Sequence, residues 1–402
     1  METSYATETA VQAEVLLQSV ASLLQDGPHT FPGFGVGSGK GGTILFYCHY
    51  AAYTGDAQYY DLALAQLEQV LQELNPQSYK SHFGNNYYQE LAELGGLLCY
   101  LAEQGHLEWD NEPLLSKIDT LLETRMHHFL TGKNLEVVNG ALSAGLYFLR
   151  RAPHSAKARR CLDTLLDAVQ ALREGDEARG YYWTCYAIIE PRVYTGLSHG
   201  SAMLISFLAA VHETGIRQAE CATLLHYATK FLLGAQVDPA TFRSSFPLWL
   251  GHEELTSNLC LLYGDLGTAY AIAKAAQILD NDAYRREAIR IARRTTTRVA
   301  LPHTLLHDAS VWYGVAGTYL LYDALHRQTD EADFASAAAY WLAQLPTRAK
   351  HQNEYLGFSS HFFGVAPEAQ LSFNFGVVGI GLTLVQALSQ GAYSLDKFIW
   401  LA

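Results

Sequence analysis

The chain has 402 residues, of which 49% are hydrophobic and 17% are charged, and this composition excludes disorder and suffices for one or two domains with a large core. Its formal net charge is −13 at pH 7, with no run of five Lys or Arg, so we do not expect it to bind nucleic acid or anionic membranes. The N-terminus lacks the basic and apolar regions of a signal peptide, and no apolar stretch approaches the length of a membrane span. These features predict a cytoplasmic protein without a membrane span.

The cysteines are consistent with this location. None of them stands in a CxxC spacing, and most lie within apolar helical patterns, where a buried and reduced thiol is the expected state. The set comprises Cys48, Cys99, Cys161, Cys185, Cys221 and Cys260.

Amphipathic segments recur along the whole chain. In the second of them, Leu64, Leu67, Leu71 and Leu74 follow one another at steps of three and four residues, with polar residues between them, as on one face of a helix. Each segment precedes a run that is apolar nearly all round, which predicts a more buried helix. The segments cover about 11–25, 56–74, 112–130, 156–173, 214–235, 281–300 and 331–345.

The buried runs share a small-residue signal at their starts. Four of them keep both glycines of a GxxG pattern, and three have lost one. We expect a glycine here to let neighbouring helices and loops approach closely. The signals begin at Gly39, Glu93, Gly140, Gly200, Gly264, Gly314 and Gly376.

Outer and inner helices therefore alternate along the chain, and few segments have the pattern of a strand. An open solenoid needs polar capping repeats, but the last unit, residues 375–402, stays apolar to its end. We predict an all-α (α/α)7 toroid in a single domain spanning residues 1–402, with the last unit packed on the first.

A glycine-rich stretch at residues 34–42 has the appearance of a phosphate-binding loop. It fails the Walker pattern, because Phe34 stands where the first glycine is required and Gly41 stands where Ser or Thr is required. Gly37, Gly39 and Gly42 satisfy GxGxxG, but no strand precedes them, so nucleotide binding is not predicted.

Four motifs between residues 196 and 382 together resemble the lanthionine synthetase C-like family. That family has an HG motif, then WCYGDxG, CHGxAG and GxAGIGLxLL, in this order and at about this spacing. The resemblance covers nearly the whole chain and implies a helical toroid that adds Cys thiols to dehydroalanine or dehydrobutyrine in a peptide. The motifs stand here as Gly196-Leu-Ser-His-Gly200, Leu262-Tyr-Gly-Asp-Leu-Gly267, Tyr313-Gly-Val-Ala-Gly317 and Phe375-Gly-Val-Val-Gly-Ile-Gly-Leu382.

The resemblance implies catalytic roles for three residues. His199, from the HG motif, is the candidate general acid or base, since the pKa of a histidine lies near neutrality. Glu136 stands where the family has an acid ahead of its third inner helix, and Tyr263 is a candidate donor to an enolate oxygen. Asp265, which follows Tyr263, is a candidate substrate-binding residue. Asn258, also assigned to substrate binding, replaces an arginine of the family, so that arginine's role is expected to be lost.

The family's zinc site is expected to be absent. Its cysteine and histidine ligands are matched by Leu262, Trp312 and Tyr313, none of which supplies a thiolate or an imidazole. Trp312 and Tyr313 are predicted instead to fill the cavity or to form a stacking wall for a peptide. A site rebuilt from Cys260, His303 or His307 stays an open alternative.

The favoured interpretation is a metal-independent thioether cyclase that needs no cofactor, acts on a precursor peptide and has a dehydratase as a second candidate partner. One alternative is a non-catalytic peptide-binding scaffold in a modification complex. A second alternative is a carbohydrate enzyme, which needs two carboxylates across the scissile bond. Its candidate carboxylates are Glu136, Glu253, Glu254, Asp265 and Asp308.

Overall fold

The computed structural model describes residues 2–26, 31, 33–80, 85–107, 110–188, 190–252, 258–362 and 367–401. The chain divides into two compact units. Unit 1 comprises Met1–Leu97, Leu306–Asp323 and Ala332–Phe398, and unit 2 comprises Leu98–Leu305, Ala324–Glu331 and Ile399–Ala402. The single domain expected over residues 1–402 stays a prediction.

A helix lies in every amphipathic segment that the sequence singled out. Its buried positions are mostly apolar, as in α3, where Ala63, Leu67 and Val70 are buried, although Leu64 of the predicted apolar face is 40% exposed. These outer helices are α1 (Glu2–Asp26), α3 (Gln58–Glu73), α5 (Glu112–Thr131), α7 (Ala156–Leu172), α9 (Gln218–Gly234), α12 (Asp282–Thr295) and α15 (Ala332–Gln344).

The apolar runs form a second set of helices, which are more deeply buried. Five of them have the first glycine of their signal as the N-terminal cap. A Cβ atom at Gly200 would lie 2.4 Å from the backbone of Tyr194, so the turn before that helix admits no side chain there. The inner helices are α2 (Lys40–Thr54), α4 (Tyr87–Glu103), α6 (Ala141–Arg151), α8 (Ser201–Glu213), α11 (Asp265–Ile278), α14 (Val315–Thr329) and α17 (Val377–Leu388).

The start expected for the second inner helix was wrong. Helix α4 begins at Tyr87, so the signal beginning at Glu93 lies inside the helix instead of at its start. The side chains of Glu90 and Glu93 explain the difference, because they project from the first turns of α4 onto the preceding glycine-rich segment. Phe34 N–H and Gly35 N–H donate to Glu90 Oε2 at 2.6 and 3.0 Å.

The contacts of Glu90 and Glu93 with the glycine-rich segment also explain why this segment does not serve as a phosphate-binding loop. Gly37 N–H donates to Glu93 Oε2 at 2.8 Å, so carboxylates of the protein itself occupy backbone N–H groups that a phosphate would need. A Cβ atom at Gly33 would lie 2.3 Å from the Glu90 carboxylate, which explains the glycine at this position.

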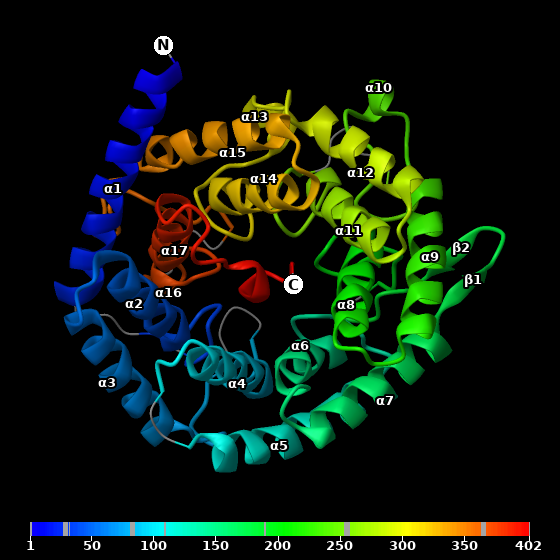
Figure 1. Cartoon of the computed structure of the whole chain (residues 1–402), viewed down its shortest axis with the longest axis horizontal. Helices are drawn as coiled ribbons and strands as arrows, with labels where there is room; N and C mark the ends of the chain where they lie inside the picture. The colour runs from blue at the N-terminus through cyan, green and yellow to red at the C-terminus, as the bar shows by residue number, and fades with distance from the viewer. Residues whose placement is uncertain are drawn as a thin grey trace. The chain divides into compact units, whose positions relative to one another are not determined.

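In unit 1 the last inner helix packs against the first two helices of the chain. Helix α17 contacts both α1 and α2 (Figure 1). A Cβ atom at Gly381 would lie 2.7 Å from Phe46 and 2.8 Å from Val20, so this approach depends on the missing side chain. The prediction that the last helical repeat packs on the first repeat is therefore confirmed.

In unit 2 the outer helices α5, α7, α9 and α12 flank the inner helices α6, α8 and α11 (Figure 1). A small antiparallel hairpin, β1 (Glu174–Asp176) and β2 (Gly180–Tyr182), follows α7 and packs on α9, where Tyr182 stacks on Phe231 with ring centroids 4.7 Å apart. All six cysteines of the chain are buried and free, as expected. The remaining short elements are α10 (Pro239–Phe242), α13 (Leu301–Thr304), η1 (Pro346–Arg348), α16 (Pro367–Leu371) and η2 (Asp396–Phe398).

Candidate active site

His199 occupies the turn that leads into α8, directly before the capping residue Gly200. This turn is fixed against the loop that precedes α11, because Ser198 N–H donates to the Leu262 carbonyl at 3.1 Å. Gly196 lies at the same contact, where a Cβ atom would be 2.8 Å from the Leu262 oxygen. The two motifs that carry His199 and Tyr263 are thus held together by their backbones.

Glu136 comes from the turn before α6 and approaches His199 from the interior of unit 2. Its Oε1 atom lies 3.3 Å from His199 Nδ1, and the exposed fractions of the two side chains are 2% for Glu136 and 18% for His199. The other oxygen, Oε2, accepts from Val138 N–H at 2.8 Å and from Asn139 N–H. Neither Glu136 Oε1 nor His199 Nδ1 has a hydrogen-bond partner among the described residues, so the contact between them is electrostatic. A carboxylate in this place favours the tautomer that carries its proton on Nδ1.

The second ring nitrogen of His199 faces two hydroxyl groups. Nε2 lies 3.1 Å from Ser198 Oγ and 3.2 Å from Tyr263 Oη. Burial raises the pKa of Tyr263, so its hydroxyl stays protonated and able to donate. In the tautomer with the proton on Nδ1, Nε2 accepts from these hydroxyls and is the ring atom that can act as a base.

The structure therefore brings together all three predicted catalytic residues, Glu136, His199 and Tyr263, in unit 2. Sequence reasoning did not single out Ser198, although it lies beside His199 in the motif. Neighbouring residues often point in different directions, so adjacency alone gave no indication that the hydroxyl turns back onto the ring.

An aromatic surface borders this cluster and was also missed. The Tyr194 ring lies edge-on to His199 with centroids 5.5 Å apart, and it lies 5.7 Å from Trp249. The Arg192 guanidinium stands over the Trp249 ring at 4.1 Å from its centroid. Arg192 and Tyr194 lie in one loop and Trp249 in another, and backbone contacts such as the bridge between Tyr194 and Trp249 bring the two loops together.

Asp265, predicted to bind substrate, is engaged within the protein. It is 1% exposed, and its carboxylate accepts from Ser245 N–H and Phe246 N–H and lies 3.4 Å from Arg298 Nη1. Burial raises the pKa of Asp265, while Arg298 opposes that shift. These contacts give Asp265 a structural role at the start of α11, and its substrate-binding role stays a prediction without support.

Asn258 also makes a local contact. Its Oδ1 atom accepts from Cys260 N–H at 3.0 Å, which turns the backbone ahead of Leu262. A part in substrate binding stays a prediction for this residue too.

Trp312 and Tyr313 belong to unit 1, where they join an aromatic cluster. Tyr313 stacks on Phe362 with centroids 4.5 Å apart and planes 5° apart, and Trp312 meets Phe375 edge-on at 5.2 Å. Phe362 is 60% exposed, so the stack reaches the surface of that unit. The predicted stacking against a peptide remains untested.

The carboxylates proposed for carbohydrate chemistry gain no support. Asp308 accepts from Ser310 Oγ at 2.7 Å and from His361 N–H at 2.7 Å, which places it in the loop packing of unit 1. Glu253 and Glu254 lie outside the described residues. Glu136 is paired with His199.

The residues at the expected zinc positions do not fit the metal. Leu262 is 1% exposed and has an aliphatic side chain, and neither Trp312 nor Tyr313 offers the thiolate or imidazole that zinc sites use. Cys260 is fully buried, and His307 stacks on His361 with centroids 4.0 Å apart. Among the described residues, no three His, Cys, Asp or Glu side chains are grouped so that they could hold a metal ion.

Fold and site together define a mostly helical protein of paired outer and inner helices that carries a Glu–His–Tyr cluster. Among solved structures, Nisin cyclase matches with a TM-score of 0.74 and 14% sequence identity, covering 96% of this chain and 97% of that chain. The likeness confirms the predicted fold class, a helical toroid.

A family model for lanthionine synthetase C-like protein matches residues 32–398. The chain belongs to this family. No curated protein matches its sequence. In the part of the chain that the structure describes, no helix is both long and apolar enough to cross a membrane.

Proposed function

We propose that this protein is a thioether-forming peptide cyclase that works without a metal ion. Family membership and the fold shared with Nisin cyclase support a cyclase-type function at the level of the family. The finer proposal rests on one observation: His199 has Glu136 at one ring nitrogen, and Tyr263 and Ser198 at the other. The proposed substrate is a precursor peptide that carries Cys and a dehydrated residue, and the proposed location is the cytoplasm.

In this mechanism His199 Nε2 takes the proton of the substrate thiol. The thiolate sulfur then forms a bond to Cβ of dehydroalanine or dehydrobutyrine, and the electron pair of the C=C bond moves onto the adjacent carbonyl as an enolate. Tyr263 donates a hydrogen bond to the enolate oxygen. The imidazolium returns its proton to Cα, which completes the thioether and regenerates neutral His199.

Glu136 has the role of a positioning residue. Its carboxylate holds the Nδ1 proton and stabilises the imidazolium that forms between the two proton transfers. Because its second oxygen accepts from two backbone N–H groups, the carboxylate is held in place beside the ring.

Without a metal ion the activation free energy rises by less than the positioning of the two reacting groups can lower it. A thiol with a pKa near 8.5 is about 3% ionised at pH 7, roughly a thirtyfold deficit or about 2 kcal/mol. Holding the thiol and the alkene of one peptide in reacting geometry can contribute about 7 kcal/mol or more. A base beside the thiol reduces the deficit further.

The alkene must come from dehydration of Ser or Thr, so a dehydratase is the second proposed partner.

The test is to incubate the protein with a dehydrated, Cys-bearing peptide and to count free thiols by alkylation, beside an elemental analysis for zinc. Loss of peptide thiol with no stoichiometric zinc supports the proposal. Retained thiol together with peptide binding would favour the scaffold alternative. The protein's own thiols add little background, because burial raises the pKa of Cys48, Cys99, Cys161 and Cys221 to about 12.

A further inference from the structure

One face of the outer helix α12 consists of arginines, in a chain whose net charge is −13. Five of its fourteen residues are Arg. Arg286, Arg290, Arg293 and Arg294 stand at steps of four, seven and eight residues from the first, so they share one face of the helix. The opposite face, with Ala288, Ile291 and Ala292, is buried in unit 2.

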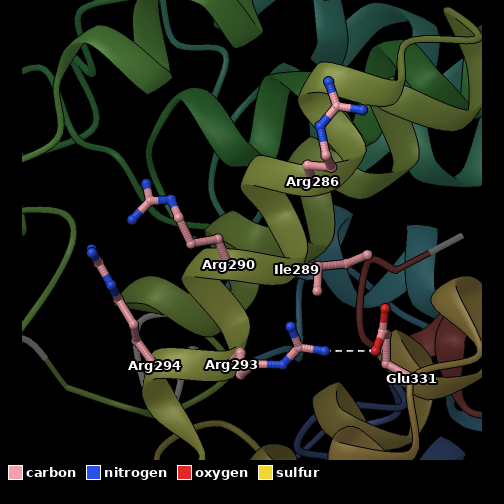
Figure 2. Close-up of a pocket in the computed structure, with 6 residues that line it drawn as sticks. All are labelled: Arg286, Ile289, Arg290, Arg293, Arg294 and Glu331. Carbon is pink, nitrogen blue, oxygen red and sulfur yellow. Dashed lines mark hydrogen bonds and ion pairs between the residues drawn. The ribbon is translucent and has the colours of Figure 1, made fainter.

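This face forms the wall of an open pocket of about 440 Å³ (Figure 2). Figure 2 shows Arg290 and Arg294 extending to the same side of α12, while Arg293 reaches in another direction to Glu331. A second open pocket of about 480 Å³ continues past the end of the helix and shares Arg294 with the first. The first pocket is lined by Arg286, Ile289, Arg290, Arg293, Arg294 and Glu331, and the second by Ala240, Arg243, Arg294, Thr297, Arg298 and His303.

The protein neutralises only part of this charge. Arg290 Nη2 pairs with Glu287 at 2.6 Å, and Arg293 Nη2 pairs with Glu331 at 2.7 Å. Arg286 and Arg294 are exposed and make no hydrogen bond or ion pair with any residue that the structure describes, while Arg294 acts electrostatically on the carboxylates of Glu287 and Asp265.

Like charges four residues apart destabilise a helix, and the helix dipole favours cations only near its C-terminus, so it does not favour Arg286 near the start of α12. The spacing of Arg286, Arg290 and Arg294 therefore leaves a like-charge repulsion on this face that an external anion would relieve.

We propose that the arginine face of α12 binds an acidic segment of the peptide substrate. Arginine forks pair with carboxylates in a two-bond geometry, and Arg286, Arg294 and Arg243 are the groups available for such pairs. Ile289 supplies an apolar contact between them, which a peptide side chain satisfies and a free phosphate does not.

The length of the surface also suits a peptide. From Arg286 to Arg294 the helix rises about 12 Å, the length of roughly four residues of extended chain. The net negative charge of the rest of the molecule opposes a long polyanion such as nucleic acid more than a short acidic segment confined to this face. The identification of the occupant as substrate rests on the proposed function, whereas the capacity of the face to bind a carboxylate-rich peptide does not.

The experiment measures fluorescence anisotropy of a labelled peptide that alternates Glu with Leu, against a matched peptide that alternates Gln with Leu. We expect the full-length protein to bind the Glu peptide at least about tenfold more tightly, with affinity falling as salt rises. The double charge reversal Arg286→Glu/Arg294→Glu should weaken binding about tenfold to a hundredfold. The matched control is Arg159→Glu/Arg160→Glu, which reverses two exposed arginines of another outer helix in unit 2 and should leave binding unchanged.

The neutral double variant Arg286→Gln/Arg294→Gln should also weaken binding. Circular dichroism of each variant checks that the fold is retained. Equal binding of the Glu and Gln peptides, equal loss in the α7 control, or a preference for duplex DNA over the Glu peptide would each overturn the proposal. Because no turnover is needed, binding of the Glu peptide by a protein that closes no rings would remove the proposed function while leaving the binding face in place.

Discussion

His199 Nδ1 lies 3.3 Å from Glu136 Oε1, and the other oxygen of that carboxylate is held by the backbone of the turn that carries it. The pair joins the turn before α6 to the turn before α8. The opposite nitrogen of the ring lies beside Tyr263, where the proposed mechanism places the substrate thiol.

Replacing Glu136 by Gln keeps the size of the side chain but removes the charge that stabilises the imidazolium. We expect kcat for ring closure to fall about 10²-fold or more, within the range of general acid–base contributions. The measurement is the rate of thiol loss from a dehydrated peptide at saturating substrate. Glu213→Gln is the control, since Glu213 is exposed and pairs with Lys274 at 3.0 Å. Equal rates for Glu136→Gln and wild type would show that the carboxylate has no part in the reaction.

Tyr263→Phe removes the proposed donor to the enolate oxygen and should lower kcat by about 10²-fold, the effect of losing one such donor. Because burial raises the pKa of Tyr263, its ionisation should cause no loss of wild-type activity up to about pH 10. Ser198→Ala, which leaves Tyr263 in place, should have a smaller effect. Rates are compared across a pH series, and a Tyr263→Phe enzyme as fast as wild type would exclude the donor role.

Asp265→Ala should destabilise the protein through its structural contacts. The substitution leaves Arg298 buried without its carboxylate and removes the acceptor of Ser245 N–H and Phe246 N–H. We expect a loss of about 3 kcal/mol or more in the free energy of unfolding, measured by urea denaturation. Unchanged stability together with a raised KM would instead support the substrate-binding role predicted from the sequence.

Glu93→Gln should alter how stability depends on pH. Burial raises the pKa of Glu93 from 4.5 to about 7 in the folded protein. Between about pH 4.5 and pH 7 the unfolded chain therefore loses this proton while the folded chain keeps it, so wild-type stability falls as pH rises. Gln does not titrate, so the Tm of the variant minus that of wild type should grow across this window and then level off. A flat difference between Glu93→Gln and wild type across this window would contradict the account.

The helices could be predicted because the helical spacing of apolar residues is a feature of the local sequence. Every outer segment and six of the seven inner starts follow from apolar spacing and from glycines that leave no room for a side chain, as at Gly200. Helix α4 begins earlier than predicted because Glu90 and Glu93 accept hydrogen bonds from a loop more than fifty residues away in the sequence. No local sequence pattern indicates that contact.

The site was predictable where a motif carried it and not elsewhere. His199, Glu136 and Tyr263 follow from the resemblance, and their contacts fit the chemistry expected of them. Asp265 stands in an equally clear motif, yet its carboxylate is engaged by backbone from residues 245–246, a pairing that depends on the tertiary fold. Tyr194 and Trp249 border the site through contacts between loops that have no shared sequence signal.

The most direct test of the central claim is the rate at which a dehydrated, Cys-bearing peptide loses its free thiol in the presence of a metal chelator, for wild type and His199→Ala side by side. The account predicts that wild type closes rings under these conditions and that His199→Ala is slower by about 10²-fold or more. Ring closure that continues undiminished in His199→Ala, or that stops in wild type when the chelator is added, would contradict it.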